Sequence, residues 1–172
     1  IATAIESPGV IRQTGTHRRI VFGEIFNAGA EITRRVRELA DHMAAANIIV
    51  EAVPDSRHTI WEKFTYLAPF AAFTGAARLP IGPLWSDEFV KNMFPDAVVE
   101  VANVARAHGI HLPADHRDRV YEYAIKLPPS TRSSLLIALQ LGKRIEVEAL
   151  QGSVVRRGAK VGVPTPIMSA LY

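Results

Sequence analysis

The spacing of apolar residues changes near residue 55 of the chain. From there onward apolar side chains recur every three or four positions over most of the sequence, which is the period of an amphipathic helix. We expect about five to seven helices with short connections in this part. The expected helical segments cover residues 56–77, 86–108, 115–126, 131–141 and 146–161.

Prolines and small polar residues mark the expected ends of these helices. The first helix should kink at Pro69, because proline removes a backbone donor and clashes with the preceding turn. Ser86 is the expected cap of the next long helix, and Ser130 or Thr131 is the expected cap of the one that precedes Gly142. Near the C-terminus a glycine followed by two prolines should end the last helix and prevent it from resuming.

Four polar residues interrupt the apolar frame of the C-terminal helices, namely Ser133, Ser134, Glu146 and Gln151. A buried carboxylate costs free energy unless it is paired. Glu146 therefore needs either solvent or a partner.

The segment before residue 55 has a different pattern. Residues 1–25 contain three short apolar runs separated by turn signals such as Ser7-Pro8-Gly9, which predicts antiparallel strands. A helix is expected over residues 31–46 and a strand over residues 48–53. This part is therefore predicted to be a small α/β segment.

Composition and charge exclude several classes of protein. The chain has no cysteine, so it has neither disulfides nor a thiolate metal site. Its net charge is +3 and its arginine pairs are dispersed, which argues against a nucleic-acid surface. The six histidines show no metal-binding pattern, and no apolar run is long enough to span a bilayer. We expect a cytoplasmic protein with no metal and no membrane partner.

Four motifs occur in a fixed order near the C-terminus: an SS-LL run, a G-K-R-x-E-x-E turn, a Q-G-x-V-V-R segment and a final G-V-P-T-P. In this order they resemble the C-terminal domain of ketopantoate reductase (2-dehydropantoate 2-reductase), and the resemblance covers the whole chain. It implies a mainly α fold, in which residues 55–172 form a helical domain like the C-terminal domain of 6-phosphogluconate dehydrogenase. Residues 1–54 would be the closing part of a Rossmann-type dinucleotide-binding domain. Since the sequence lacks an initiating Met, we expect it to begin inside a larger protein whose Rossmann half is missing.

The resemblance also assigns roles to individual residues. Lys63, in a W-x-K context, would be the general acid, although the residues alone favour a surface lysine. Ser134 would bind the substrate, with Ser133 as the alternative. Glu146 would contact the cofactor, with Glu148 as the weaker alternative. On the residues alone, the serines could equally bond back to the backbone, and Glu146 could equally stabilise a helix start.

The implied function is the NADPH-dependent reduction of a 2-keto acid, either 2-dehydropantoate in pantothenate and coenzyme A biosynthesis or a related acid. Family members often carry two asparagines where this chain has Leu67 and Ala71, so the sequence does not determine which 2-keto acid is the substrate. No G-x-G-x-x-G phosphate loop occurs, so we expect the chain alone to be inactive. The expected partners are the missing Rossmann domain and a second copy in a homodimer. The alternative function is a non-catalytic helical dimerisation or interaction module.

Overall fold

A computed structural model of the chain describes residues 2–14, 19–26 and 29–172. Within these ranges it contains eight helices and four strands. The predicted mainly helical fold class is therefore confirmed. The chain divides into two compact units, Ile1–Thr59 and Ile60–Tyr172.

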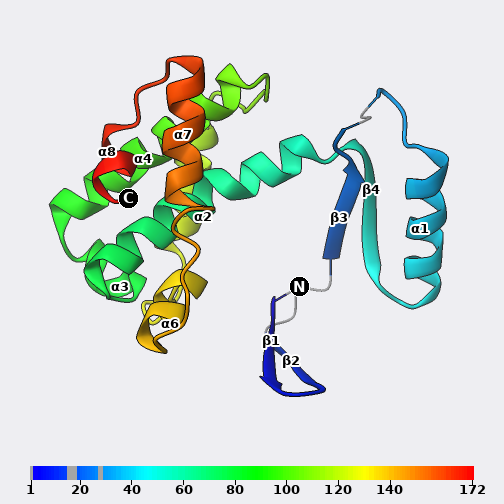
Figure 1. The fold of residues 1–172 in the computed structure, drawn as a ribbon, viewed down its shortest axis with the longest axis horizontal. Helices are drawn as coiled ribbons and strands as arrows, with labels where there is room; N and C mark the ends of the chain where they lie inside the picture. Colours follow the sequence, from blue (N-terminus) through cyan, green and yellow to red (C-terminus); the bar gives the residue numbers. More distant parts are fainter. Residues whose placement is uncertain (1, 15–18, 27–28) are drawn as a thin grey trace. The chain divides into compact units, whose positions relative to one another are not determined.

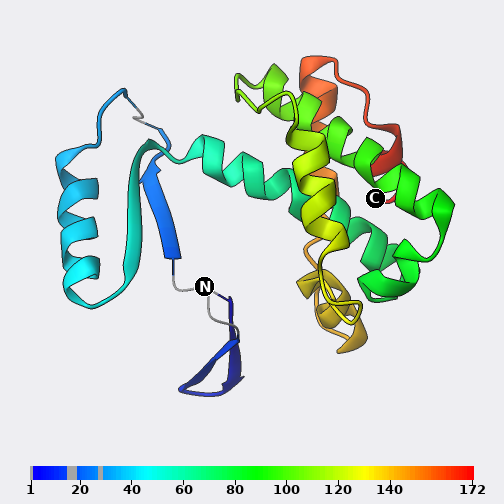
Figure 2. The same ribbon diagram turned by 180° about the vertical axis from the view of Figure 1, so that it is seen from behind.

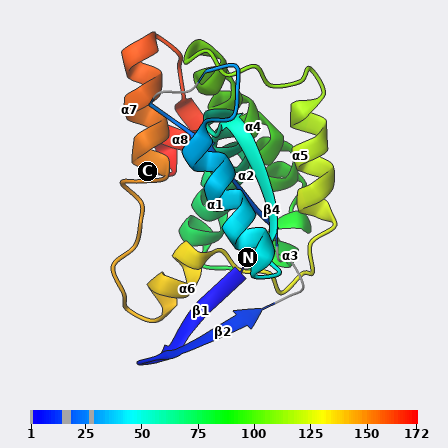
Figure 3. The same cartoon turned by 90° about the vertical axis from the view of Figure 1, so that its right-hand side faces the viewer.

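The first unit begins with two antiparallel strands, β1 (Ala2–Ser7) and β2 (Val10–Thr14). Figure 3 shows them as a hairpin. The predicted turn joins them, with Gly9 at φ +80°, a conformation that glycine adopts without the steric cost of a side chain. Ile5 and Ile11 lie opposite each other on this hairpin, and both are exposed.

The rest of the first unit is a parallel β-α-β element formed by β3 (Arg19–Glu24), α1 (Arg34–Ala45) and β4 (Ile49–Asp55). The expectation of antiparallel pairing is therefore wrong for β3. The reason is the intervening helix, which returns the chain to the end of the sheet where it started. A side chain at Gly23 would overlap the Val53 carbonyl oxygen, so a glycine is required where the strand register shifts.

A buried carboxylate, Glu24, holds this element together at the end of β3, with 4% of its surface exposed. Arg35 Nε and Thr33 Oγ1 donate hydrogen bonds to Glu24 Oε1 at 2.7 Å and 2.6 Å. The Arg35 guanidinium also pairs with the second carboxylate oxygen. These bonds, first from Arg35 and then from Thr33, lower the pKa of Glu24 to about 2.

The second unit is built around α4 (Glu88–Ala107), which buries Phe94, Val98 and Val101 completely. Figures 1 and 2 show α7 and α5 on opposite sides of it. Four helices pack closely on α4, namely α3 (Ile81–Trp85), α5 (His116–Ile125), α7 (Gln151–Val161) and α8 (Pro166–Ala170). In the described residues, none of the helices is long and apolar enough to cross a membrane.

Helix α2 (Arg57–Ala77) continues through Pro69 and Gly75 without a break. Its buried face contains mostly small residues between Ala68 and Gly75. A Cβ at Gly75 would lie 2.5 Å from Leu135 Cδ2 of helix α6 (Ser134–Gln140). The glycine therefore allows α6 to pack closely on α2, and tertiary packing outweighs its low helix propensity.

The start of α4 differs from the expectation by one residue. Asp87 is the cap, because its Oδ1 accepts a hydrogen bond from Val90 N at 2.9 Å. Ser86 follows the short helix α3, and its Oγ donates to Gly82 O at 3.3 Å. Helix α3 begins at Ile81, inside the stretch 78–83 that its prolines and glycine predict to be a loop, so this expectation is wrong from residue 81 onward. The short helix was missed because two of its five residues are glycine and proline.

The C-terminal turn is confirmed in part. Gly162 ends α7 in the left-handed conformation, with φ +70°, as the sequence predicted. The following prolines stop α7, but Pro166 also starts α8, since the fixed φ of proline suits the first position of a helix.

Glu100, in the middle of α4, caps α8 from a distance of more than sixty residues along the chain. Its Oε1 accepts from Ile167 N at 2.8 Å, and its Oε2 accepts from Met168 N at 2.9 Å. The carboxylate is 8% exposed. It therefore satisfies two backbone donors that the first turn of α8 cannot satisfy itself.

Candidate functional site

Lys63 lies in the second turn of α2, with its side chain exposed. The helix start is fixed by Asp55, whose Oδ1 accepts from Arg57 N at 2.8 Å. The neighbouring Phe64, and Leu67 one turn further on, are partly buried against other apolar residues. The ammonium group is therefore carried by a helix that is anchored on its apolar side.

The two adjacent serines at the start of α6 have different environments. Ser133 is 2% exposed and caps the helix, with its Oγ accepting from Leu136 N at 3.0 Å. Thr74 Oγ1 of α2 also donates to Ser133 Oγ at 2.7 Å. Ser134, the first residue of the helix, is exposed. The expected cap at Ser130 or Thr131 is therefore wrong, because the helix starts later than expected.

The two glutamates before α7 also differ. The Glu146 backbone oxygen accepts from Ala149 N and Leu150 N, while its carboxylate is exposed and forms no ion pair in the described residues. Glu148 Oε1 accepts from Tyr172 OH at 2.7 Å, and its Oε2 accepts from Arg156 Nη1 at 2.6 Å. These bonds, first from Tyr172 and then from Arg156, lower the pKa of Glu148.

The segments that carry Lys63, Ser134 and Glu146 meet in one apolar cluster, which we call the α2–α6 cluster. It consists of Ala71, Leu135 and Leu150, with Phe64, Leu67 and Ile145 packed against them. Each candidate residue directly neighbours a member in the sequence. Within the described part of the chain, no hydrogen bond or ion pair joins the three candidate side chains to one another.

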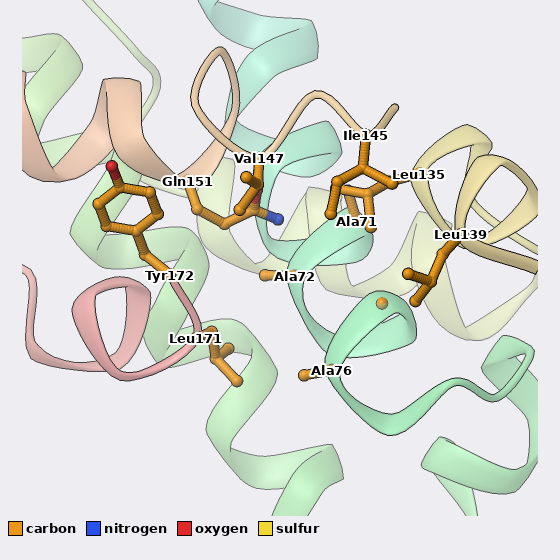
Figure 4. A pocket seen from close by; sticks show the side chains of 11 residues that line it. Ala71, Ala72, Ala76, Leu135, Leu139, Ile145, Val147, Gln151, Leu171 and Tyr172 are labelled. Carbon is orange, nitrogen blue, oxygen red and sulfur yellow. The ribbon is translucent and has the colours of Figure 1, made fainter. Parts of the chain in front are cut away.

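A pocket of about 200 Å³ opens beside this cluster (Figure 4). It is lined by Ala71, Ala72, Gly75, Ala76, Leu135, Leu139, Ile145, Val147, Gln151, Leu171 and Tyr172. Gln151 was singled out in the sequence as a polar residue within an apolar frame. Tyr172 gave no such signal, because a C-terminal aromatic residue has no periodic context.

Among the described residues, the histidines do not form a site of the kind that binds a metal. His116 is 2% exposed at the start of α5, and its Nε2 lies 2.7 Å from Thr65 Oγ1, which donates to Glu62 O. Across residues 2–14, 19–26 and 29–172 no group of three His, Asp or Glu residues could hold a metal ion.

Comparisons with known proteins agree on one family. Residues 55–172 match the family model described as "Ketopantoate reductase PanE/ApbA C terminal". The relatives include an uncharacterised oxidoreductase, YkpB, of Bacillus subtilis, with 23% identity over 100% of this chain and 56% of its own length. A 2-dehydropantoate 2-reductase of Pyrobaculum aerophilum is 27% identical over 98% of this chain and 58% of its own.

A solved structure gives the same result. The crystal structure of a PanE/ApbA family ketopantoate reductase from Ralstonia eutropha superposes with a TM-score of 0.84 and 32% identity. The superposition covers 54% of the Ralstonia chain and 99% of this chain. The chain thus spans about half the length of the relatives that it matches.

Proposed function

The chain belongs to the ketopantoate reductase family, and on that premise we propose that the protein reduces a 2-keto acid with a hydride from NADPH. Lys63 would be the general acid, Ser134 would bind the substrate and Glu146 would order the cofactor and substrate. The Pyrobaculum relative is named for this activity, as a 2-dehydropantoate 2-reductase.

One observation carries this proposal: residues 63, 134 and 146, far apart in the sequence, each adjoin the α2–α6 cluster. Their side chains are exposed and so are accessible to a substrate. A dimerisation module, the alternative function, would need only apolar surface and has no use for these polar groups.

The chemistry asked of each residue is simple. The cofactor, when bound, supplies the hydride that forms the new C–H bond at the keto carbon. Lys63 donates a proton from Nζ to the carbonyl oxygen, which becomes the hydroxyl, and its positive charge stabilises the developing alkoxide. The exposed amine then regains a proton from water. Ser134 Oγ would donate to the substrate carboxylate.

The chain carries no G-x-G-x-x-G phosphate loop, so Glu146 is its one proposed contact with the nucleotide. We propose that the pyrophosphate is held by residues outside this chain. The chain alone should then neither bind NADPH tightly nor turn over, and the complete protein should do both.

The substrate side of α2 is apolar. Leu67, one turn after Lys63, packs against the α2–α6 cluster, and Ala71 is fully buried in it. A site without hydrogen-bonding groups discriminates weakly for or against a substrate hydroxyl. We therefore propose that the protein accepts 2-keto acids with apolar side chains at least as well as 2-dehydropantoate.

The role of Lys63 is tested with Lys63→Ala in the complete enzyme. We expect kcat to fall by about 10²- to 10⁴-fold, the usual contribution of a general acid, with unchanged thermal unfolding. The matched control is Lys126→Ala, which removes another exposed lysine, at the C-terminal cap of α5. Equal activity of both variants would contradict the assignment and favour the interaction module.

The substrate preference is tested by comparing 2-dehydropantoate with trimethylpyruvate, using NADPH and NADH. Trimethylpyruvate differs from 2-dehydropantoate only in lacking the terminal hydroxyl group. We expect kcat/KM for trimethylpyruvate to be equal or higher. Leu67→Asn should shift the ratio toward 2-dehydropantoate, because it introduces a hydrogen-bonding group. A wild-type preference for 2-dehydropantoate above about a hundredfold would refute the apolar specificity while leaving Lys63 untouched.

The remaining parts of the proposal follow from the family. They are a place in pantothenate biosynthesis, a cytoplasmic location and a homodimer. A ketopantoate reductase of Staphylococcus aureus with this fold is described as dimeric. Sedimentation of the complete protein tests the dimer.

A further inference from the structure

We propose that Arg156 and Tyr172 are positioning residues for Glu146, because together they hold Glu148 and with it the turn that carries Glu146. We call Glu148, Arg156 and Tyr172 the Glu148 cluster. The inference rests on the proposed function, in which the Glu146 carboxylate orders the cofactor and substrate. It gives that carboxylate a support that acts on the backbone of the turn rather than on the reacting groups.

Glu146 lies in the connection between α6 and α7, where residues 141–150 form neither a helix nor a strand. Its backbone oxygen accepts from Ala149 N at 3.1 Å and from Leu150 N at 3.0 Å, which closes a turn. These bonds fix the shape of the turn but not its orientation relative to the helices. The Glu146 side chain is exposed, so the position of its carboxylate depends on what holds the turn.

Apolar packing holds the two ends of this turn. Ile145 and Leu150 both belong to the α2–α6 cluster, where Leu150 is buried and Ile145 packs against it. The hydrophobic effect is not directional, so this packing keeps the turn on the protein surface without setting the direction of the residues between its ends. A further, directional set of contacts is needed to orient the carboxylate.

The Glu148 cluster supplies these directional contacts. From α7, Arg156 Nη2 donates to Glu148 O and Arg156 Nη1 donates to Glu148 Oε2, each at 2.6 Å. Tyr172, two residues after α8 ends, donates from its hydroxyl to Glu148 Oε1 at 2.7 Å and accepts from Arg156 Nη1 at 3.3 Å. A single exposed ion pair contributes little, whereas a network of charge-assisted bonds has a defined geometry. The turn is therefore tied to two separate elements.

A glycine makes room for this arrangement. A Cβ at Gly152, in the first turn of α7, would lie 2.7 Å from Arg156 Nη1 and 3.0 Å from two ring carbons of Tyr172. Gly152 N also donates to Val147 O at 3.0 Å, which joins the turn to the helix. Glycine is a poor helix former, so its place here is explained by the close approach of the two side chains that hold Glu148.

Charge pairing in the cluster separates the two glutamates of the turn. The bonds from Tyr172 and Arg156 lower the pKa of Glu148, so this carboxylate stays ionised and paired. Glu146 keeps its carboxylate unpaired among the described residues. In the same part of the chain, no hydrogen bond or ion pair joins the cluster to Lys63. The cluster should therefore affect cofactor binding and leave proton donation by the lysine intact.

The test uses steady-state kinetics of the complete enzyme with NADPH as the varied substrate. Tyr172→Phe removes the hydroxyl and keeps the ring, and it should raise the KM for NADPH by about three- to tenfold, the change that one hydrogen bond supports. kcat at saturating NADPH and keto acid should stay within about twofold, since Lys63 is untouched. The matched control is Tyr123→Phe, which removes another exposed phenol oxygen, from α5, and should change neither constant.

Gly152→Ala perturbs the cluster from the backbone side. Its methyl group must displace the Arg156 guanidinium, so it should raise the KM for NADPH to a similar extent, although alanine favours the helix. A raised KM with an unchanged thermal midpoint would support positioning, because lost stability could not then account for the change.

A double-mutant cycle decides whether the cluster acts through Glu146. Glu146→Ala should itself raise the KM for NADPH, and adding Tyr172→Phe to it should change that KM by no more than about 1.5-fold. Effects that simply multiply would overturn the positioning role. A wild-type KM in Tyr172→Phe and Gly152→Ala, beside a raised KM in Glu146→Ala, would also overturn it and leave the reductase assignment standing. A wild-type KM in Glu146→Ala would overturn both this inference and the role of Glu146 in the proposed function.

Discussion

The hydrogen bonds of Glu100 offer a quantitative test of the fold. This carboxylate, 8% exposed in α4, accepts from Ile167 N at 2.8 Å and from Met168 N at 2.9 Å. A hydrogen bond to a charged group contributes about 1.5–3 kcal/mol, and loss of a helix cap costs about 1–2 kcal/mol. Since both bonds serve one helix end, we expect Glu100→Ala to lower the free energy of unfolding by about 3 kcal/mol.

Glu100→Gln should cost about half as much. Its amide keeps one acceptor oxygen but places an NH₂ group against a backbone donor. The measurement is urea unfolding followed by circular dichroism, with the loss read from the midpoint at constant slope. In a thermal melt, Glu100→Ala should lower the midpoint by roughly 6–12 °C for a chain of this size.

The matched control is Asp96→Ala, which removes an exposed carboxylate from the same helix. It should change the free energy of unfolding by no more than about 0.5 kcal/mol. If Glu100→Ala and Asp96→Ala had the same effect, water would be replacing the carboxylate at α8, and the long-range cap would not stabilise the fold.

Three further predictions concern other contacts. Ser133→Ala should lower the free energy of unfolding by about 1–2 kcal/mol through loss of the helix cap. Ser134→Ala should leave the free energy of unfolding unchanged and raise the KM of the complete enzyme; the opposite pattern would show that the two serines have exchanged roles. Gly82→Ala should destabilise strongly, because a Cβ there would lie 2.9 Å from the backbone of Pro129, whereas Gly29→Ala, with nothing within 4 Å, should be neutral in the same urea titration. The pKa of Glu24 is lowered to about 2, so its bonds stabilise the fold fully at pH values above the pKa of an unfolded glutamate, and this contribution is lost as pH falls toward about 2. Glu24→Gln should therefore make the free energy of unfolding less dependent on pH over this range. The same slope in the variant and the wild type would contradict the buried ion pair.

The sequence predicted the helical class and most helix positions because local signals dominate there. Periodic apolar residues and the glycine at 162 depend only on neighbours within a few turns. The errors arise where the decisive partner is distant. The parallel pairing of β3 depends on β4, whose paired residues lie at least thirty positions away in the sequence. The cap of α6 lies at Ser133 rather than at the expected Ser130 or Thr131, and Ser133 accepts a hydrogen bond from Thr74 of α2, 59 residues away.

The same distinction applies to the polar residues. Glu100 lies among valines of α4 and shows no sign of function in the sequence, since its partners are the backbone donors of α8. Gln151 is conspicuous in the sequence as a polar residue in an apolar frame, but only the packing of α2, α6 and α7 shows that its Oε1 has no hydrogen-bond partner among the described residues. Motif order indicated the family; it could not indicate the pocket.

The candidate site contains two serines, Ser133 and Ser134, and two glutamates, Glu146 and Glu148. In each pair one side chain forms hydrogen bonds that stabilise the fold. A helix cap must turn back toward the first turn that it satisfies, so Ser133 is buried and its neighbour Ser134 faces solvent. Glu148 is likewise bound to Tyr172 and Arg156, while the Glu146 carboxylate stays unpaired among the described residues. A group held by the fold cannot reorganise around a substrate without breaking those bonds. The free member of each pair is therefore the better candidate for binding, and this supports Ser134 and Glu146 over Ser133 and Glu148 on physical grounds that are independent of the motif.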